Sequence, residues 1–69
     1  MSLTEGWTEN QGEFSNEEGV TIKREYGKTP NGNELGGSWV YRVKGEFVDY
    51  DQYFIDLCNR YGLKPKSWI

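Results

Sequence analysis

The last third of the chain contains the stretch VDYDQYFIDLCNRYG, residues 48–62, which carries the signals of one short helix. Asp49 and Gln52 have the spacing of a capping box, in which each side chain accepts a hydrogen bond from a backbone N–H at the helix start. Gly62 suits the left-handed conformation that commonly ends a helix. Together these signals predict a helix over residues 50–61.

Apolar side chains lie along one side of this predicted helix. Leu63 follows the helix end and is expected to contact Cys58. A helix of about three turns is marginal alone in water, so it must pack against another element. The apolar residues recur with the spacing of a helix that has 3.6 residues per turn. The residues of this apolar face are Tyr50, Phe54, Leu57 and Tyr61.

The element that the helix packs against is predicted to be an antiparallel sheet. Residues 20–26, VTIKREY, and residues 38–44, SWVYRVK, both alternate between apolar and polar side chains, as half-buried strands do. Residues 30–32 between them, Pro-Asn-Gly, are a strong turn signal, because proline fixes φ and glycine accepts a positive φ. The two stretches predict a hairpin with Trp39 and Tyr41 on its inner face.

Residues 13–15 predict a third, shorter strand that turns at residues 16–19. The fold class is then α+β: a small antiparallel sheet of two to three strands packed against one C-terminal helix, in β-β-β-α order. We expect residues 1–12 to be a poorly ordered acidic segment. Residues 13–69 are expected to form a single α+β domain.

Size and composition agree with one small domain. The chain has 69 residues, of which 35 % are hydrophobic and 28 % charged, and a chain of this length has no room for a second core. Three Trp, five Tyr and three Phe supply much of the apolar surface, and each aromatic ring buries a large area. A compact core is therefore expected despite the few aliphatic residues.

Charge is distributed unevenly along the chain. The formal net charge is −3, yet residues 1–18 hold five glutamates and no basic residue. The remainder is mildly basic. A solvated polar segment that keeps the domain soluble explains this pattern, and an acidic surface that meets a basic partner is the sharper alternative.

The same composition bears on location and on catalysis. No apolar run approaches the roughly 20 residues that span a bilayer, and the first residues lack the features of a signal peptide, so we expect a cytoplasmic protein without a membrane partner. The chain has no histidine and a single cysteine, Cys58, which leaves no Ser-His or Cys-His pair and no cysteine-based zinc site. We expect no enzyme, no cofactor, no metal site and no small-molecule substrate.

Protein–protein interaction is the function class that remains. Tryptophan and tyrosine are typical anchors of interfaces, and a chain this small without disulfides or metals is close to the stability limit of a lone core. We therefore predict a non-enzymatic accessory or regulatory protein that binds a protein partner or a second copy of itself. The candidate core or interface anchors are Trp39, Tyr41, Tyr53 and Trp68.

A weak DNA- or RNA-binding module is the alternative. Basic residues fall on the predicted outer face of the hairpin or near its end, where they could contact phosphates. Glu25 on the same face and the negative total charge weigh against nucleic acid. The candidates are Lys23, Lys28, Arg42 and Lys44.

Overall fold

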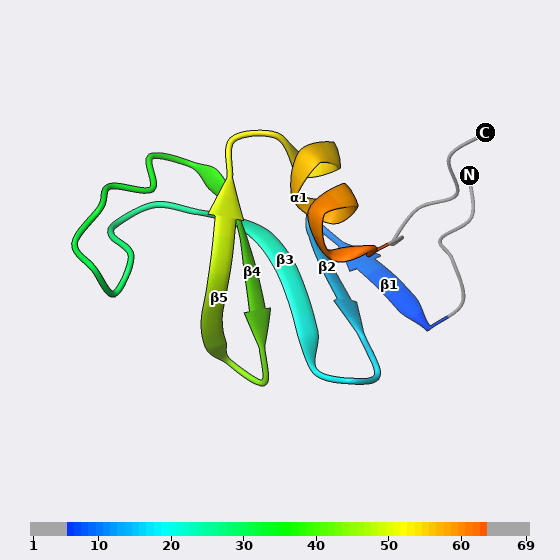
Figure 1. Cartoon of the computed structure of the whole chain (residues 1–69). Helices are drawn as coiled ribbons and strands as arrows, with labels where there is room; N and C mark the ends of the chain where they lie inside the picture. The colour runs from blue at the N-terminus through cyan, green and yellow to red at the C-terminus, as the bar shows by residue number, and fades with distance from the viewer. Residues whose placement is uncertain (1–5, 64–69) are drawn as a thin grey trace.

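A computed structural model describes residues 6–63, which form a five-stranded antiparallel sheet and one helix (Figure 1). The strands lie across the sheet in chain order, so each one pairs with its sequence neighbours. The α+β class and the C-terminal helix are confirmed, whereas the expected number of two to three strands is wrong. The elements are β1 Trp7–Asn10, β2 Glu13–Asn16, β3 Val20–Glu25, β4 Ser38–Val43, β5 Glu46–Asp51 and α1 Phe54–Tyr61.

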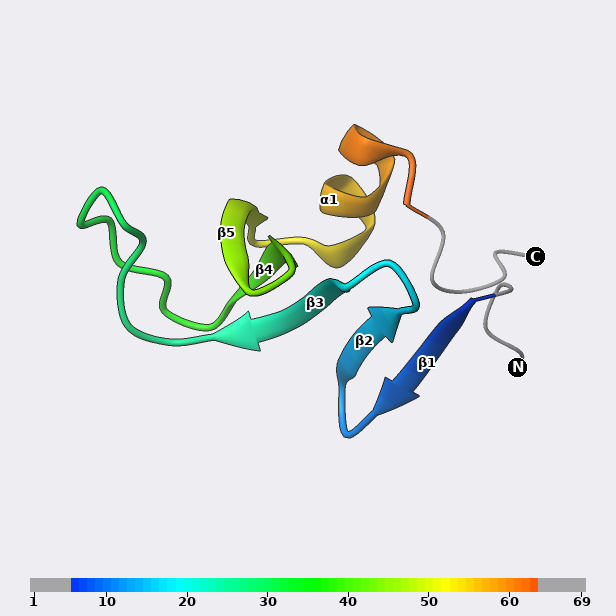
Figure 2. The same cartoon turned by 90° about the horizontal axis from the view of Figure 1, so that it is seen from below.

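The helix lies over one face of a strongly curved sheet, and the opposite face carries no second layer among residues 6–63 (Figure 2). The hydrophobic core forms between α1 and the first of these faces. Ile22, Leu57 and Cys58 are completely buried there, and Phe14 is nearly so. Trp39 and several other large side chains pack around this cluster. The predicted packing of one helix across one sheet face is confirmed.

The β3–β4 hairpin forms as its alternating pattern predicts. Ile22 pairs with Tyr41 and Arg24 with Trp39, so Trp39 and Tyr41 lie on the inner face as expected. The connection over residues 26–37 projects from the sheet (Figures 1 and 2). Its tip turns at residues 30–32, where the Gly32 N–H donates to the Thr29 carbonyl at 2.9 Å, which confirms the predicted turn.

The start of the helix differs from the prediction. Residues 46–51 form the edge strand β5, in which Asp49, Tyr50 and Asp51 pair with residues of β4. The helix begins only at Phe54, and Tyr53 is its N-cap without a side-chain hydrogen bond. Pairing with β4 satisfies backbone groups that a longer helix would otherwise satisfy, so the capping-box signal of Asp49 and Gln52 is overridden.

The end of the helix agrees with the prediction. Gly62 has φ 66°, in the left-handed region. Its N–H donates to the Asn59 carbonyl, and the Leu63 N–H donates to the Cys58 carbonyl at 2.8 Å. This pair of bonds is a Schellman motif. Leu63 packs against the core cluster that contains Cys58, as expected from the sequence.

Both outer hairpins use two-residue turns with positive φ. Gln11 and Gly12 join β1 to β2 with φ values of 54° and 83°, and Lys44 and Gly45 join β4 to β5 with 53° and 85°. Such turns match the twist of paired strands. The segment 1–12, expected to be poorly ordered, therefore contains a strand over residues 7–10.

Candidate functional site

Trp39 and Tyr41, predicted as core or interface anchors, both lie on the helix-covered face. The Trp39 ring centroid is 4.8 Å from that of Phe54 and 6.2 Å from that of Phe14. Tyr41 packs on Tyr61 with centroids 4.7 Å apart. Both side chains are half-buried. Their rings pack mainly between α1 and the sheet and so stabilise the position of the helix.

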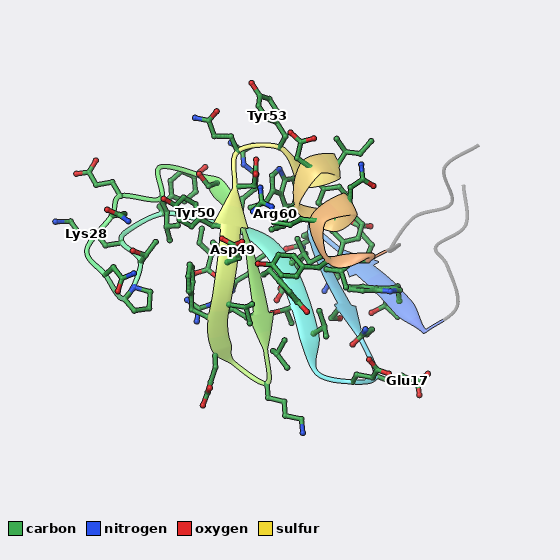
Figure 3. The ribbon with its side chains drawn as sticks, viewed as in Figure 1. Glu17, Lys28, Asp49, Tyr50, Tyr53 and Arg60 are labelled. Carbon is green, nitrogen blue, oxygen red and sulfur yellow. The ribbon has the colours of Figure 1, made fainter. Side chains whose placement is uncertain are left out.

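Tyr53 has a different place. It lies in the turn between β5 and α1, exposes 62 % of its surface, and projects away from the sheet and the helix (Figure 3). Ile55, two residues later, exposes 49 %. We call these two residues the Tyr53–Ile55 surface. Large exposed apolar side chains mark an interaction surface where they form one continuous patch. Trp68, the fourth candidate, lies outside the described residues.

A polar cluster ties the helix to the edge strand beside this surface. The Arg60 guanidinium donates to Asp49 at 2.9 Å and to Asp51, and the Tyr61 hydroxyl donates to Asp49 at 2.5 Å. Partial burial pushes the pKa of Asp49 upward, but the hydrogen bonds from Tyr61, from the Tyr50 N–H and from Arg60 outweigh it and hold this pKa below its usual range. We expect both carboxylates to stay ionised near neutral pH.

Sequence reasoning missed the cluster because it placed Asp49 and Asp51 at the start of a helix. In that position their carboxylates would meet backbone N–H groups instead of Arg60. The spacing of nine and eleven residues between these acids and Arg60 carries no signal until β5 and α1 are known to lie side by side. Ile55 was likewise missed, because a single apolar residue off the helix stripe is common.

The basic candidates are not brought together. Arg42 is committed to Glu25, with bonds of 2.8 and 3.1 Å from its Nε and Nη2 atoms. These bonds hold the pKa of Glu25 below its usual range. Lys23 shares their sheet face, where its cross-strand neighbour is Val40. An arginine already paired with an internal carboxylate has less charge to offer to a phosphate.

The two remaining basic candidates lie at opposite ends of β4. Lys28 is on the projecting β3–β4 connection (Figure 3). Lys44 belongs to the β4–β5 turn, where its N–H donates to the Gly19 carbonyl at 2.7 Å. Placed this way, the four basic residues do not form one continuous basic stripe.

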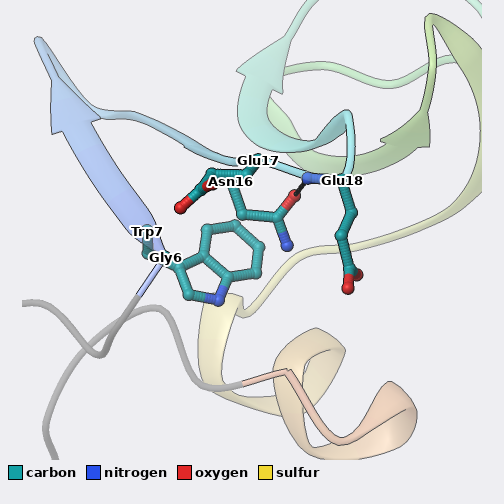
Figure 4. Close-up of a pocket in the computed structure, with 5 residues that line it drawn as sticks. All are labelled: Gly6, Trp7, Asn16, Glu17 and Glu18. Atoms are coloured by element: carbon teal, nitrogen blue, oxygen red, sulfur yellow. Dashed lines mark hydrogen bonds between the residues drawn. The ribbon is translucent and has the colours of Figure 1, made fainter.

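An open pocket of about 460 Å³ lies beside the β2–β3 turn (Figure 4). Trp7 reaches it from β1, because its register partner in β2 is Asn16 at the start of that turn. The Asn16 carboxamide oxygen accepts the N–H groups of Glu18 and Val20 at 2.9 and 3.0 Å and so holds the turn. The residues that line the pocket are Gly6, Trp7, Asn16, Glu17 and Glu18. This pocket was not predicted from the sequence, because Trp7 lies in a segment that was expected to be poorly ordered.

Cys58 is buried beneath α1, and burial raises the pKa of its thiol to about 11. The thiolate form that reacts as a nucleophile or metal ligand is therefore scarce near neutral pH. Within residues 6–63 no group of three or more acidic or cysteine side chains is arranged to hold a metal ion. Nor is any helix of this part of the chain long and apolar enough to cross a membrane.

No protein-family model, curated protein or solved structure matches this chain.

Proposed function

We propose that this chain is a small cytoplasmic, non-enzymatic accessory protein that acts by protein–protein contact through the Tyr53–Ile55 surface. A second copy of the chain is its simplest partner. The observation that carries the proposal is the exposure of these two side chains, 62 % and 49 %, at the start of a helix whose Leu57 and Cys58 are fully buried. Burying such side chains in a contact removes apolar surface from water, which is the main favourable term in association.

The surroundings of the Tyr53–Ile55 surface suit a defined interface. Arg60, in the last turn of α1, pairs with Asp49 and Asp51 of β5, and this cluster ties the end of the helix to the sheet edge. An apolar centre beside satisfied polar groups is the usual anatomy of an interface. Because these ion pairs hold the helix in place, less conformational entropy is lost when a partner binds.

Self-association of the full chain tests the proposal. Sedimentation velocity over a range of protein concentrations is expected to show a dimer that Tyr53→Ser and Ile55→Ser weaken. Tyr26→Ser is the matched control, because Tyr26 is also exposed, at 73 %, but its ring lies against Gly37 of the β3–β4 connection, outside the Tyr53–Ile55 surface. If the wild-type protein stays monomeric at all concentrations, the proposed homodimer is excluded. Equal weakening by Tyr26→Ser would remove the assigned surface.

The nucleic-acid alternative has a separate test. Titration of the full chain with mixed-sequence duplex DNA at low salt, followed by ¹⁵N–¹H NMR, would shift the signals of the basic residues if their charges contact phosphates. Reversing the charge of Lys23 and Lys44 should then abolish the shifts and leave self-association unchanged. Under the protein-contact proposal we expect an unchanged spectrum.

A further inference from the structure

The pocket beside the β2–β3 turn combines an aromatic ring with negative charge. Within residues 6–63, the side chains of Glu17 and Glu18 form no ion pair and no hydrogen bond. Both are exposed, while Trp7 is half-buried and its indole lies against the turn (Figure 4). Two carboxylates that form no ion pair in this part of the chain, beside an indole, create a local field that favours a positively charged group. Lys44 lies at the other end of the same turn, where its side chain is close to Gly19.

We propose that this pocket binds the guanidinium group of an arginine side chain on a basic peptide segment of a partner protein. A guanidinium is planar, so it can stack on the Trp7 indole while its N–H groups donate to a carboxylate of Glu17 or Glu18 in a two-bond arrangement. A lysine ammonium is more strongly hydrated and lacks a flat face, so it gains less from the indole. The volume of about 460 Å³ is ample for one such side chain.

Two further features fit an arginine ligand. Residues 6–18 contain four glutamates and no basic residue, so a basic segment is attracted to this part of the surface before it enters the pocket. The turn itself is held by the two hydrogen bonds to the Asn16 carboxamide oxygen, which limits the entropy lost on binding.

The pocket is separate from the Tyr53–Ile55 surface. Tyr53 and Glu17 lie at opposite ends of the molecule (Figure 3). The inference therefore adds a second binding site with a different chemistry, and it does not require the chain to form a dimer.

Peptide titration of the full chain tests the ligand class. The probe is a capped peptide Gly-Arg-Arg-Gly, added while the indole N–H signal of Trp7 is followed by NMR, with the indole of Trp39 in the core as an internal reference. We expect the Trp7 signal to shift in a saturable way that weakens as salt is added. The neutral citrulline analogue should cause no shift, and the corresponding lysine peptide should bind several-fold more weakly.

A pair of charge-matched variants tests the site. Glu17→Gln with Glu18→Gln should raise the dissociation constant of the arginine peptide about fivefold, as expected for two solvent-exposed ion pairs. The control, Glu13→Gln with Glu34→Gln, removes the same charge at two exposed acids outside the pocket and should leave the constant within about twofold. All four substitutions keep the side-chain size, so the fold is retained.

Four results would overturn the inference. An absent Trp7 shift, or binding of the citrulline peptide, would show that the pocket does not recognise a guanidinium cation. Equal weakening by the two double variants would reduce the effect to net charge. Lysine and arginine peptides of equal affinity would exclude stacking on the indole. A monomeric wild-type protein that still binds the peptide would leave this site in place while removing the proposed homodimer.

Discussion

Ile22 and Val40 are equally buried, each with 0 % exposure, but they lie on opposite faces of the sheet. Ile22 belongs to the cluster under α1, where Leu57 and Cys58 cover it. Val40 follows Trp39 and precedes Tyr41, so it points to the face without a helix. Helix α1 covers Ile22, whereas no helix or strand of residues 6–63 lies over Val40.

Long side chains flank Val40 on this face. Its cross-strand neighbours are Lys23 and Tyr50, and the Arg42–Glu25 ion pair runs along the same face with an N–O distance of 2.8 Å. Long side chains can shield apolar surface with their methylene groups while their charged ends stay hydrated. The comparison teaches that burial alone does not identify a closed core, and it predicts unequal responses to substitution on the two faces.

The largest effect is expected under the helix. Leu57→Ala should lower the free energy of unfolding by about 3 kcal/mol, because it removes three carbons from a fully enclosed position. Ile55→Ala, on the exposed side of α1, should change it by less than about 0.5 kcal/mol. Urea denaturation followed by circular dichroism measures both. Similar losses in the two variants would mean that α1 does not pack as described.

A smaller loss is expected on the open face. Val40→Ala removes two carbons, and with about 0.8 kcal/mol for each buried methylene it should lower the free energy of unfolding by about 1.5 kcal/mol. The long side chains that flank it can move into part of the space, which limits the cavity. The same urea titration gives the value. A loss as large as that of Leu57→Ala would show that the open face contains a rigid second core.

The ion pair on the open face is the next test. A double-mutant cycle with Glu25→Gln and Arg42→Gln should give a coupling of about 1 kcal/mol or less. The pKa of Glu25 is lowered in the fold, so the coupling is present above the unfolded pKa of about 4.3 and is lost as pH falls through the folded value.

Lys28 and Glu34 provide the control for this cycle. They face each other through a backbone bridge but form no ion pair in the described part of the chain. The corresponding cycle should therefore give a coupling near zero. Equal couplings for the two pairs would show that the Arg42–Glu25 contact contributes nothing specific.

The smallest effect is expected for the exposed cluster at the end of β5. A backbone hydrogen bond from Tyr53 holds the pKa of Asp51 below its usual range, and Arg60 adds to this effect and to that on Asp49. The stability from these carboxylates is therefore present above their unfolded pKa values and is lost as pH falls through the folded ones. Arg60→Gln should make urea midpoints depend less on pH between about pH 5 and pH 2, whereas Lys28→Gln should not. Parallel curves for wild type and Arg60→Gln would contradict the role of Arg60.

The β5–α1 region shows why local signals failed at one point. Val48 is the extra residue of a bulge, since Tyr41 pairs with Asp49 while Arg42 pairs with Phe47. A bulge breaks the alternation by which a strand is recognised. The turn before β5 is Lys44-Gly45 instead of the usual Asn-Gly, so its signal was weak as well. Tyr50 was therefore assigned to the apolar face of the expected helix. In the structure it lies on the open face of the sheet, as the cross-strand neighbour of Val40.

Local sequence was sufficient for the elements whose geometry is set by neighbours along the chain. Alternation over residues 20–26 and 38–44 predicted the central hairpin, and Gly62 ended the helix, because side-chain periodicity and positive φ are properties of a few adjacent residues. The tertiary structure alone decided the five-strand sheet, the late helix start, the Arg60 cluster and the Trp7 pocket. Each of these depends on backbone pairing or charge contact between strands and helix, and the free energy of such contacts exists only after the chain has brought them together.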